Sequence, residues 1–181
     1  MIAAFAFLLG ALAWTFTEYW LHRTLGHKKG AKNPFSIEHL RHHADVSYFA
    51  PTWKKFVAAG SIMVLIGSPL AWALGGAGIA GALGFVVMYV SYEIIHRRLH
   101  THPGTTRYGR WARRHHLHHH YSRPHGNEGV TTPLWDWVFG TLEVPAQVQV
   151  PPKNALAWML DDTGHLKPEL SAEYRMGRSA A

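Results

Sequence analysis

The most constraining feature of this sequence is a stretch of 37 residues, 56–92, that contains neither a charged residue nor a histidine. An α-helix rises about 1.5 Å per residue and the hydrocarbon core of a bilayer is about 30 Å thick, so this stretch is nearly two membrane spans long. A glycine-rich segment near its middle, Gly75-Gly76-Ala77-Gly78, supplies a turn. We therefore expect a helical membrane hairpin with arms at Phe56–Leu74 and Ile79–Tyr92, the first kinked at Pro69.

Another apolar segment begins the chain. Between Met1 and Leu21 the only charged residue is Glu18. A cleaved signal peptide is the rival interpretation, but the segment has no basic start and continues without a small-residue cleavage site into Trp20 and His22. The sequence thus predicts an all-α fold, an integral membrane helical bundle of about three to four spans with a histidine-rich helical cap.

The positive charges predict how this bundle is oriented. All 18 Lys and Arg lie outside Met1–Leu21 and outside the hairpin, among them Lys28, Lys29 and Lys32. A hairpin returns both ends to one side, and an excess of Lys and Arg indicates that this side is cytoplasmic. We expect a multi-pass membrane protein whose histidine-rich segments face the cytoplasm. Its N-terminus would then lie on the opposite side, unless the first segment is re-entrant.

The remaining composition excludes other classes. The net charge of +7 could suggest a nucleic-acid partner, but no basic face interleaved with stacking aromatics is present, so none is expected. A length of 181 residues fits one functional domain, which we place at residues 1–143. Beyond Glu143 the chain is polar, without a strong period and interrupted by prolines, so residues 144–181 are predicted to form an extended or partly ordered tail.

Ten of the 15 histidines fall into four boxes, and cysteine is absent, so any metal must be held by imidazole or carboxylate. Side chains three or four residues apart share one face of a helix, so spacings such as HxxHH and HxxxH direct imidazoles toward one point. The wider spacing in the first box suits a helix end at Gly26. The boxes are HRTLGH (His22, His27), HLRHH (His39, His42, His43), HRRLH (His96, His100) and HLHHH (His116, His119, His120).

Ten nitrogen ligands are too many for one ion and suit two. A structural zinc site needs four ligands and would explain one pair of boxes. A metal buffer would use irregular histidine tracts on a soluble chain. Two boxes lie on each side of the hairpin, and its folding would bring them together. The sequence therefore predicts a dinuclear metal centre at the mouth of the membrane.

The other titratable residues divide into two classes. Glu18 and Glu93 lie at the edges of apolar segments, just before His22 and His96, and each is a candidate ligand or a carboxylate that orients an imidazole. Asp136, inside a tryptophan-rich segment, is interpreted as a structural residue. The remaining histidines are interpreted as exposed, hydrogen-bonding or supporting residues: His102, His115, His118, His125 and His165.

The order of the four boxes, with an apolar hairpin between the second and third, resembles the fatty acid hydroxylase and sterol desaturase superfamily of membrane oxygenases. The likeness extends through residues 126–136 (GNEGVTTPLWD) and 139–141 (FGT), which look like the segment after the family's last box. It covers roughly residues 15–143. The resemblance implies an O2-dependent catalytic domain with two iron ions, for which zinc can substitute in a purified protein, and the ten box histidines as ligands.

The resemblance also implies a lipid substrate drawn from the bilayer. The 181 residues have no room for an attached haem-binding electron-transfer domain, so a separate ferredoxin or cytochrome b5 type donor is expected. The segment after the last box looks closest to hydroxylases of acyl chains, which act on carbon 2 in some members. A carotenoid ring hydroxylase, a sterol or lipid desaturase and a non-enzymatic membrane metal-binding protein remain alternatives.

Overall fold

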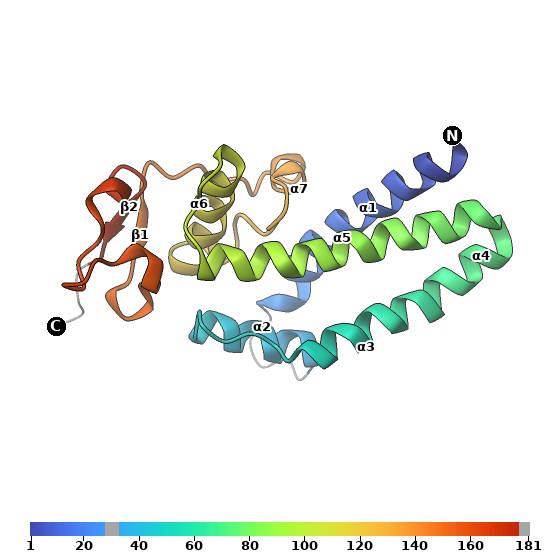
Figure 1. The fold of residues 1–181 in the computed structure, drawn as a ribbon, viewed down its shortest axis with the longest axis horizontal. Helices are drawn as coiled ribbons and strands as arrows, with labels where there is room; N and C mark the ends of the chain where they lie inside the picture. The colour runs from blue at the N-terminus through green and yellow to red at the C-terminus, as the bar shows by residue number, and fades with distance from the viewer. Residues whose placement is uncertain (28–32, 178–181) are drawn as a thin grey trace.

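The computed structural model describes residues 1–27 and 33–177. Lys28, Lys29 and Lys32, which entered the prediction of orientation, lie outside the described residues, as do the last four residues of the tail. The chain is mostly helical, with one small sheet near its C-terminal end (Figure 1).

Three helical segments in the described part of the chain are long and apolar enough to cross a membrane: Ile2–Gly26, Thr52–Leu74 and Gly76–Thr101. The first consists of α1 (Ile2–Leu21) and a π-helical turn, η1 (His22–Gly26). The second consists of α3 (Thr52–Ile62), a π-helical turn η2 (Met63–Gly67) and α4 (Ser68–Leu74), and the third is α5 (Gly76–Thr101). The predicted helical membrane bundle is confirmed, with three candidate spans among the described residues.

The hairpin differs from the prediction at its turn and in its second arm. Gly75 alone makes the turn, with φ 55° in the left-handed region that glycine tolerates, and the helix restarts at Gly76. The second arm continues to Thr101, nine residues beyond the predicted end at Tyr92. The irregularity predicted at Pro69 begins earlier, in η2, because a proline has no N–H to continue the α-helical ladder.

The membrane helices pack unequally. Backbones of α1 and α5 approach so closely that a Cβ on Gly10 would lie 1.9 Å from the Gly81 carbonyl oxygen, and one on Gly84 would lie 2.0 Å from that of Phe7. Trp14 of α1 adds an edge-on contact with Phe85 of α5. By contrast, none of the residues of α3 is buried. The α1–α5 pair is therefore the tightly packed part of the membrane region, and α3 is loosely attached.

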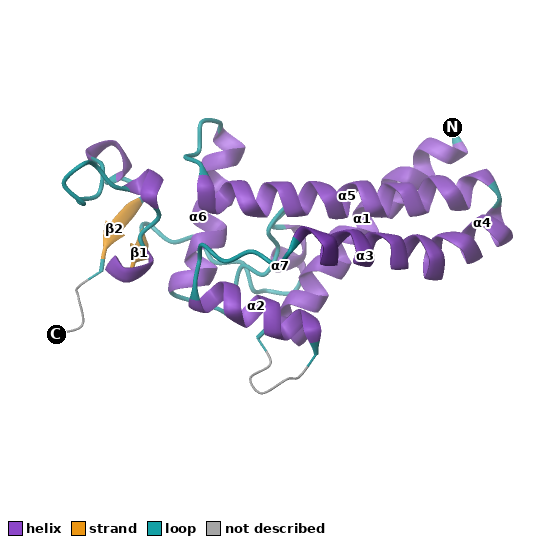
Figure 2. Cartoon of the chain, turned by 60° about the horizontal axis from the view of Figure 1, so that its bottom comes forward, coloured by secondary structure: helices purple, strands orange, loops and turns teal. Residues whose placement is uncertain are grey.

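The cap consists of α2 (Pro34–Ala44), α6 (Arg107–Tyr121), α7 (Leu134–Val138) and the loop 122–133, and it lies at the end of α5 away from the hairpin turn (Figures 1 and 2). The Asn33 side chain caps α2 by accepting from the Ser36 N–H, and Thr106 caps α6 by accepting from the Gly109 N–H. These caps fix where each histidine-bearing helix begins, and so which of its residues face inward.

The described part of the tail is more ordered than the sequence indicates. Strands β1 (Val148–Val150) and β2 (Tyr174–Met176) pair in parallel, and three short 3₁₀ turns lie between them, η3 (Pro152–Asn154), η4 (Ala157–Met159) and η5 (Pro168–Leu170). Val148, Met159 and Tyr174 are buried against Leu117 of α6. Isolated apolar residues that lack a period along the sequence thus converge in the tertiary fold, and the described part of this segment is ordered. The domain boundary at residue 143 stays a prediction.

Candidate metal centre

The ten box histidines converge on two points. In each group the five nitrogen atoms that could bind a metal lie within 4.8 Å of one another. All ten predicted ligands are members, and the groups contain no other residue of the described chain. The first histidine group is His22, His27, His39, His43 and His119, and the second histidine group is His42, His96, His100, His116 and His120.

The two HxxHH boxes each contribute to both groups. In α2, His39 and His43 are four residues apart and join the first group, whereas His42 joins the second. In α6 the assignment is reversed, because His116 and His120 join the second group and His119 joins the first. Residues four apart lie nearly above one another on a helix, and the histidine between them points to the neighbouring side.

The remaining two boxes each serve one group. His96 and His100 are one turn apart on α5 and both belong to the second group. His22 and His27 are five apart, a poor spacing for an α-helix, but the chain between them is the π-helical turn η1. A π turn closes hydrogen bonds from i to i+5, which brings such residues to one side. Their rings stack at a centroid distance of 5.4 Å.

The donor set fits metal ions. Nε2 atoms face one another at 3.1 Å between His22 and His39, and at 2.8 Å between His100 and His116. Nitrogens bound at about 2.1 Å to one ion and 90° apart would lie about 3.0 Å from each other. Both ring nitrogens of His120 are buried and have no hydrogen-bond partner among the described residues. The groups thus bring unshared lone pairs together, as ligands do around a metal.

Hydrogen bonds on the opposite ring nitrogen orient several of the box imidazoles. The Nδ1 of His22 donates to the Glu128 carbonyl, that of His42 donates to the Tyr48 carbonyl at 2.7 Å, and that of His119 donates to the Gly126 carbonyl at 2.9 Å. Such bonds fix the tautomer that leaves Nε2 free for a metal. Each of these rings is therefore aimed before any ion arrives.

Burial keeps the imidazoles neutral. Burial, helped by neighbouring imidazoles, lowers the pKa of His27 to about 3 and that of His43 to about 2. It also lowers the pKa of His116, His119 and His120 well below the ordinary value. Metal ligands must be deprotonated. The site therefore presents ligand-competent nitrogens at neutral pH.

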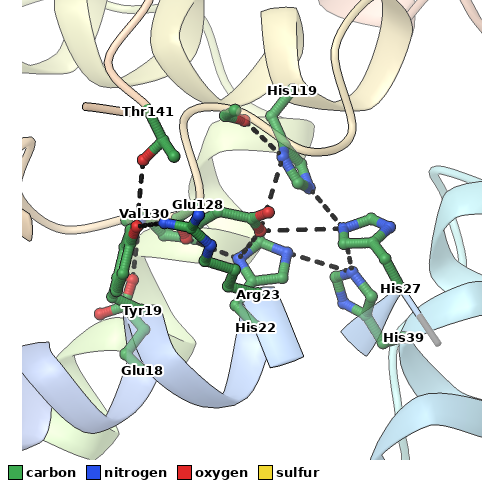
Figure 3. A network of polar contacts seen from close by, with 12 residues as sticks. Glu18, Tyr19, His22, Arg23, His27, His39, His119, Glu128, Val130 and Thr141 are labelled. Atoms are coloured by element: carbon green, nitrogen blue, oxygen red, sulfur yellow. Dashed lines mark hydrogen bonds and ion pairs between the residues drawn. The ribbon is translucent and has the colours of Figure 1, made fainter. Parts of the chain in front are cut away.

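Glu128, which the sequence did not single out, faces the first histidine group (Figure 3). Its Oε2 lies 3.6 Å from the Nδ1 of His22 and 3.9 Å from both His27 and His119, and its side chain is fully buried. Neither carboxylate oxygen has a hydrogen-bond partner among the residues that the structure describes. Burial, then the nearby Asp136, raise the pKa of Glu128 to about 8. A cation in the first group would compensate this carboxylate, whose isolated burial is costly.

Asp136 holds the backbone that carries Glu128. Its carboxylate accepts the N–H groups of Glu128 and Gly129, both at 2.8 Å, and lies 3.3 Å from the Nε2 of buried His115. Thr141 donates to it as well, and in turn contacts Tyr19 of α1. Asp136 thus supports the backbone near the first histidine group and belongs to neither group, in agreement with its interpretation as a structural residue.

The two candidate carboxylates from the sequence lie apart from the histidine groups. Glu18 accepts the N–H groups of Val130 and Thr131 and the Thr131 hydroxyl, so it ties the segment after Glu128 to α1 (Figure 3). Glu93 forms an ion pair with Lys55 of α3. Within residues 1–27 and 33–177, neither carboxylate forms a hydrogen bond or ion pair with a box imidazole. The structure therefore gives both of them roles as anchors between segments.

The five histidines set aside in the sequence lie outside both groups. His115 faces Asp136, and His118 lies 3.0 Å from Glu143. The other three, His102, His125 and His165, are exposed. In the run from His115 to His120, one helical face therefore supplies members of the two histidine groups and the other supplies contacts with Asp136 and Glu143.

A pocket of about 110 Å³ opens beside the centre. Its wall includes His42 and His96 of the second group and His39 of the first. Phe35, Phe49 and Tyr92 supply aromatic surface, and Glu38, Tyr48, Lys55 and Glu93 supply polar groups. A small molecule in this pocket would contact the imidazoles directly.

Comparisons with known proteins agree with this architecture. The family model described as "Fatty acid hydroxylase" matches residues 7–141. Mouse fatty acid 2-hydroxylase is 35% identical, over 75% of this chain and 39% of its own length. The ceramide very long chain fatty acid hydroxylase SCS7 of Saccharomyces cerevisiae is 32% identical over 78% of this chain and 38% of its own. The dihydroceramide fatty acyl 2-hydroxylase FAH1 of Arabidopsis thaliana is 32% identical over 75% and 59%.

A solved structure is similar as well. It is described as full-length scs7p with only the hydroxylase domain visible, and it superposes with a TM-score of 0.60 at 27% identity, over 79% of this chain and 57% of that one. The chain spans about two fifths of the length of the mouse and yeast relatives. The match of the family model covers most of the chain and confirms the resemblance carried by the histidine boxes. This chain belongs to the fatty acid hydroxylase family.

Proposed function

We propose that this chain is an O2-dependent lipid hydroxylase that inserts oxygen into an unactivated C–H bond of a fatty acyl chain, at a centre of two iron ions. The observation that carries the proposal is the pair of five-imidazole groups beside a pocket at the end of the membrane helices. Neutral imidazoles suit redox-active iron. The proposed ligands are the ten members of the two histidine groups.

Carbon 2 is the proposed position of attack. Relatives carry the names fatty acid 2-hydroxylase and dihydroceramide fatty acyl 2-hydroxylase, which supports an acyl substrate and this regiochemistry. The balanced reaction converts a C2–H bond, O2, two electrons and two protons into a C2–OH group and water. The electrons come from a separate electron-transfer protein of the ferredoxin or cytochrome b5 type.

The residues of this chain would have distinct roles in the reaction. The iron pair, when bound, would supply O2 activation. Carbonyl acceptors at Gly126, Glu128 and Tyr48 hold the imidazoles in the tautomer that presents Nε2. Glu128 balances positive charge at the first histidine group. Phe35, Phe49 and Tyr92 would exclude water from the pocket in which the acyl chain is attacked.

The catalytic face is proposed to lie in the cytoplasm. Basic residues gather at the ends of the spans that carry the cap, including Lys54 and Lys55 before α3 continues into the membrane and Arg97 and Arg98 near the end of α5. The excess of Lys and Arg on that side supports this orientation. An electron donor would then reach the cap from the cytosol.

Metal analysis and lipid profiling together test the function. The purified protein is expected to contain two iron ions and, with O2 and a reductant, to convert N-acyl lipids or fatty acids to 2-hydroxy products detected by mass spectrometry. His43→Ala and His119→Ala, both in the first histidine group, should remove activity and about one of the two bound ions, whereas His165→Ala, an exposed matched control, should retain both. Failure of the metal-loaded protein to hydroxylate or desaturate any lipid would refute the function. Equal metal retention in all three variants would refute the assignment of the ligands.

A further inference from the structure

The pocket beside the metal centre and a second cavity share one wall. The second cavity, of about 230 Å³, lies between α3 and α5 and is lined mainly by apolar side chains, among them Phe56, Ala59 and Val90. Lys55 and Glu93 line both cavities and form an ion pair with each other. This pair is therefore the polar boundary between an apolar crevice and the imidazole-lined pocket.

The crevice is accessible from the side on which lipid lies. α3 buries none of its residues, and Phe56 and Val90 have exposed fractions of 74% and 45%. In a membrane these surfaces face hydrocarbon chains rather than water. An acyl chain could enter between α3 and α5 with its apolar length in the crevice.

The pair is unusual for its position. Both side chains lie on segments long and apolar enough to span the membrane, and each is about one-fifth exposed. Ionisable groups within such segments are costly and commonly functional. Its neighbour, the Lys54–Glu38 ion pair, is more exposed at its lysine, and Lys54 lines neither cavity. The inner pair is thus the one in contact with the path from crevice to metal centre.

Attack at carbon 2 constrains the polar end of the substrate, because carbon 2 is bonded directly to the carbonyl carbon. The carbonyl oxygen must therefore lie near the metal centre, where a buried oxygen needs a hydrogen-bond donor. An ammonium has three donor positions, and its pairing with Glu93 leaves donors for another acceptor. Because Glu93 already neutralises Lys55, the pair favours a neutral carbonyl and repels a second carboxylate.

We propose that Lys55 is a positioning residue that donates a hydrogen bond to the acyl carbonyl of an N-acyl lipid amide, and that Glu93 holds Lys55 and disfavours free fatty acids. The apolar chain of the substrate lies in the α3–α5 crevice. This inference rests on the proposed acyl hydroxylation and adds the residue pair that positions the acyl carbonyl and discriminates an amide from a free acid.

The first test removes the donor. Lys55→Met keeps the length and apolar stem of the side chain but cannot donate, so the KM for an N-palmitoyl sphingoid base should rise roughly tenfold, and hydroxylation should spread from carbon 2 to neighbouring carbons. Lys55→Arg, which keeps the donor and the pair, should restore carbon-2 selectivity. The matched control is Lys54→Met, which should leave KM and product position unchanged. Bound iron, measured in every variant, should stay at the wild-type level.

The second test changes the charge preference. Glu93→Gln leaves Lys55 as an uncompensated cation, so the ratio of kcat/KM for free palmitate to that for the amide should rise at least about tenfold. This ratio separates substrate selection from folding, because a loss of packing would lower kcat/KM for both substrates together.

The outcomes distinguish the inference from the function beneath it. If wild-type protein hydroxylates no lipid, the proposed function fails. If wild-type protein hydroxylates the amide but Lys55→Met keeps its KM and carbon-2 selectivity, or wild type prefers the free acid, the inference is overturned and the function stands. If Lys55→Met loses iron, the results for Lys55→Arg and Glu93→Gln decide. An unchanged ratio of kcat/KM for free palmitate to that for the amide in Glu93→Gln then overturns the inference.

Discussion

The two histidine groups have the same ligand chemistry and different surroundings. The first group has Glu128 within 3.6–3.9 Å of three of its imidazoles. No carboxylate among the described residues lies within ion-pair distance of a second-group imidazole. The second group instead supplies two of the three imidazoles that line the pocket. Similar donor sets thus have different surroundings, because one group faces a buried acid and the other lines a pocket.

The largest expected effect comes from breaking one group at a time. His116→Ala and His119→Ala remove neighbouring ligands of α6 that belong to different groups, so each should lose about one of two ions, and the double variant should lose both. Elemental analysis of the purified proteins measures this. Activity should fall at least about a hundredfold in both single variants, since the reaction needs the whole centre. Two retained ions in either variant would contradict the grouping.

The next effect concerns the carboxylate that distinguishes the groups. Glu128→Gln removes its charge with little change in shape, so metal affinity at the first group should fall about tenfold to a hundredfold, with the second group unchanged. Competition with a chelating dye resolves the two affinities. Glu143→Gln is the control, because Glu143 pairs with His118 and Arg123 outside both groups. Equal weakening at both groups would show that Glu128 does not distinguish them.

A smaller effect is expected behind Glu128. Asp136→Asn weakens the acceptor of the Glu128 and Gly129 N–H groups and the contact with His115, which should lower the free energy of unfolding by about 3 kcal/mol. Thermal unfolding of the variant against exposed Asp162→Asn measures it. Any loss of metal should be confined to the first group. A loss at the second group alone would contradict the expectation that Asp136 and Glu128 support the first group only.

The smallest effect is expected at the outer face of α6. His118→Ala removes a partly exposed contact with Glu143 and no member of either group, so unfolding should change by less than about 1 kcal/mol and bound metal should not change. A drop in metal content here would mean that the division of the His115–His120 run into two faces is wrong.

What the sequence predicts well is local. Most of the ten candidate ligands follow from spacings within single helices, and the candidate spans follow from uninterrupted apolar runs. The partition into two groups does not follow from spacing, because His42 and His43 are adjacent in sequence, and their different groups become apparent only when α2 meets α5 and η1. Recognising that His22 and His27 fit a π turn also needed the backbone.

Carboxylates were the harder case. Glu18 and Glu93 attract attention because they lie near boxes along the chain, yet their partners are Thr131 and Lys55. Glu128 has no helical spacing to any box and reaches the first group through the fold of its loop. The signal that could have directed attention to it is its place as an isolated acid in the GNEGV segment directly after the last box.

The way α2 is attached has a consequence for the order of assembly. Its links to α5 and α6 include ring contacts, His42 with His96 at 4.6 Å and His43 with His120 at 4.0 Å between centroids. α1 and α5, in contrast, are joined by close backbone packing at Gly10 and Gly84 that needs no ion. If ions bind between the helices, their binding free energy becomes part of the free energy of closing the cap. The membrane helices could then insert and pair without metal. The cap, in contrast, would complete its folding only when the cell supplies metal ions.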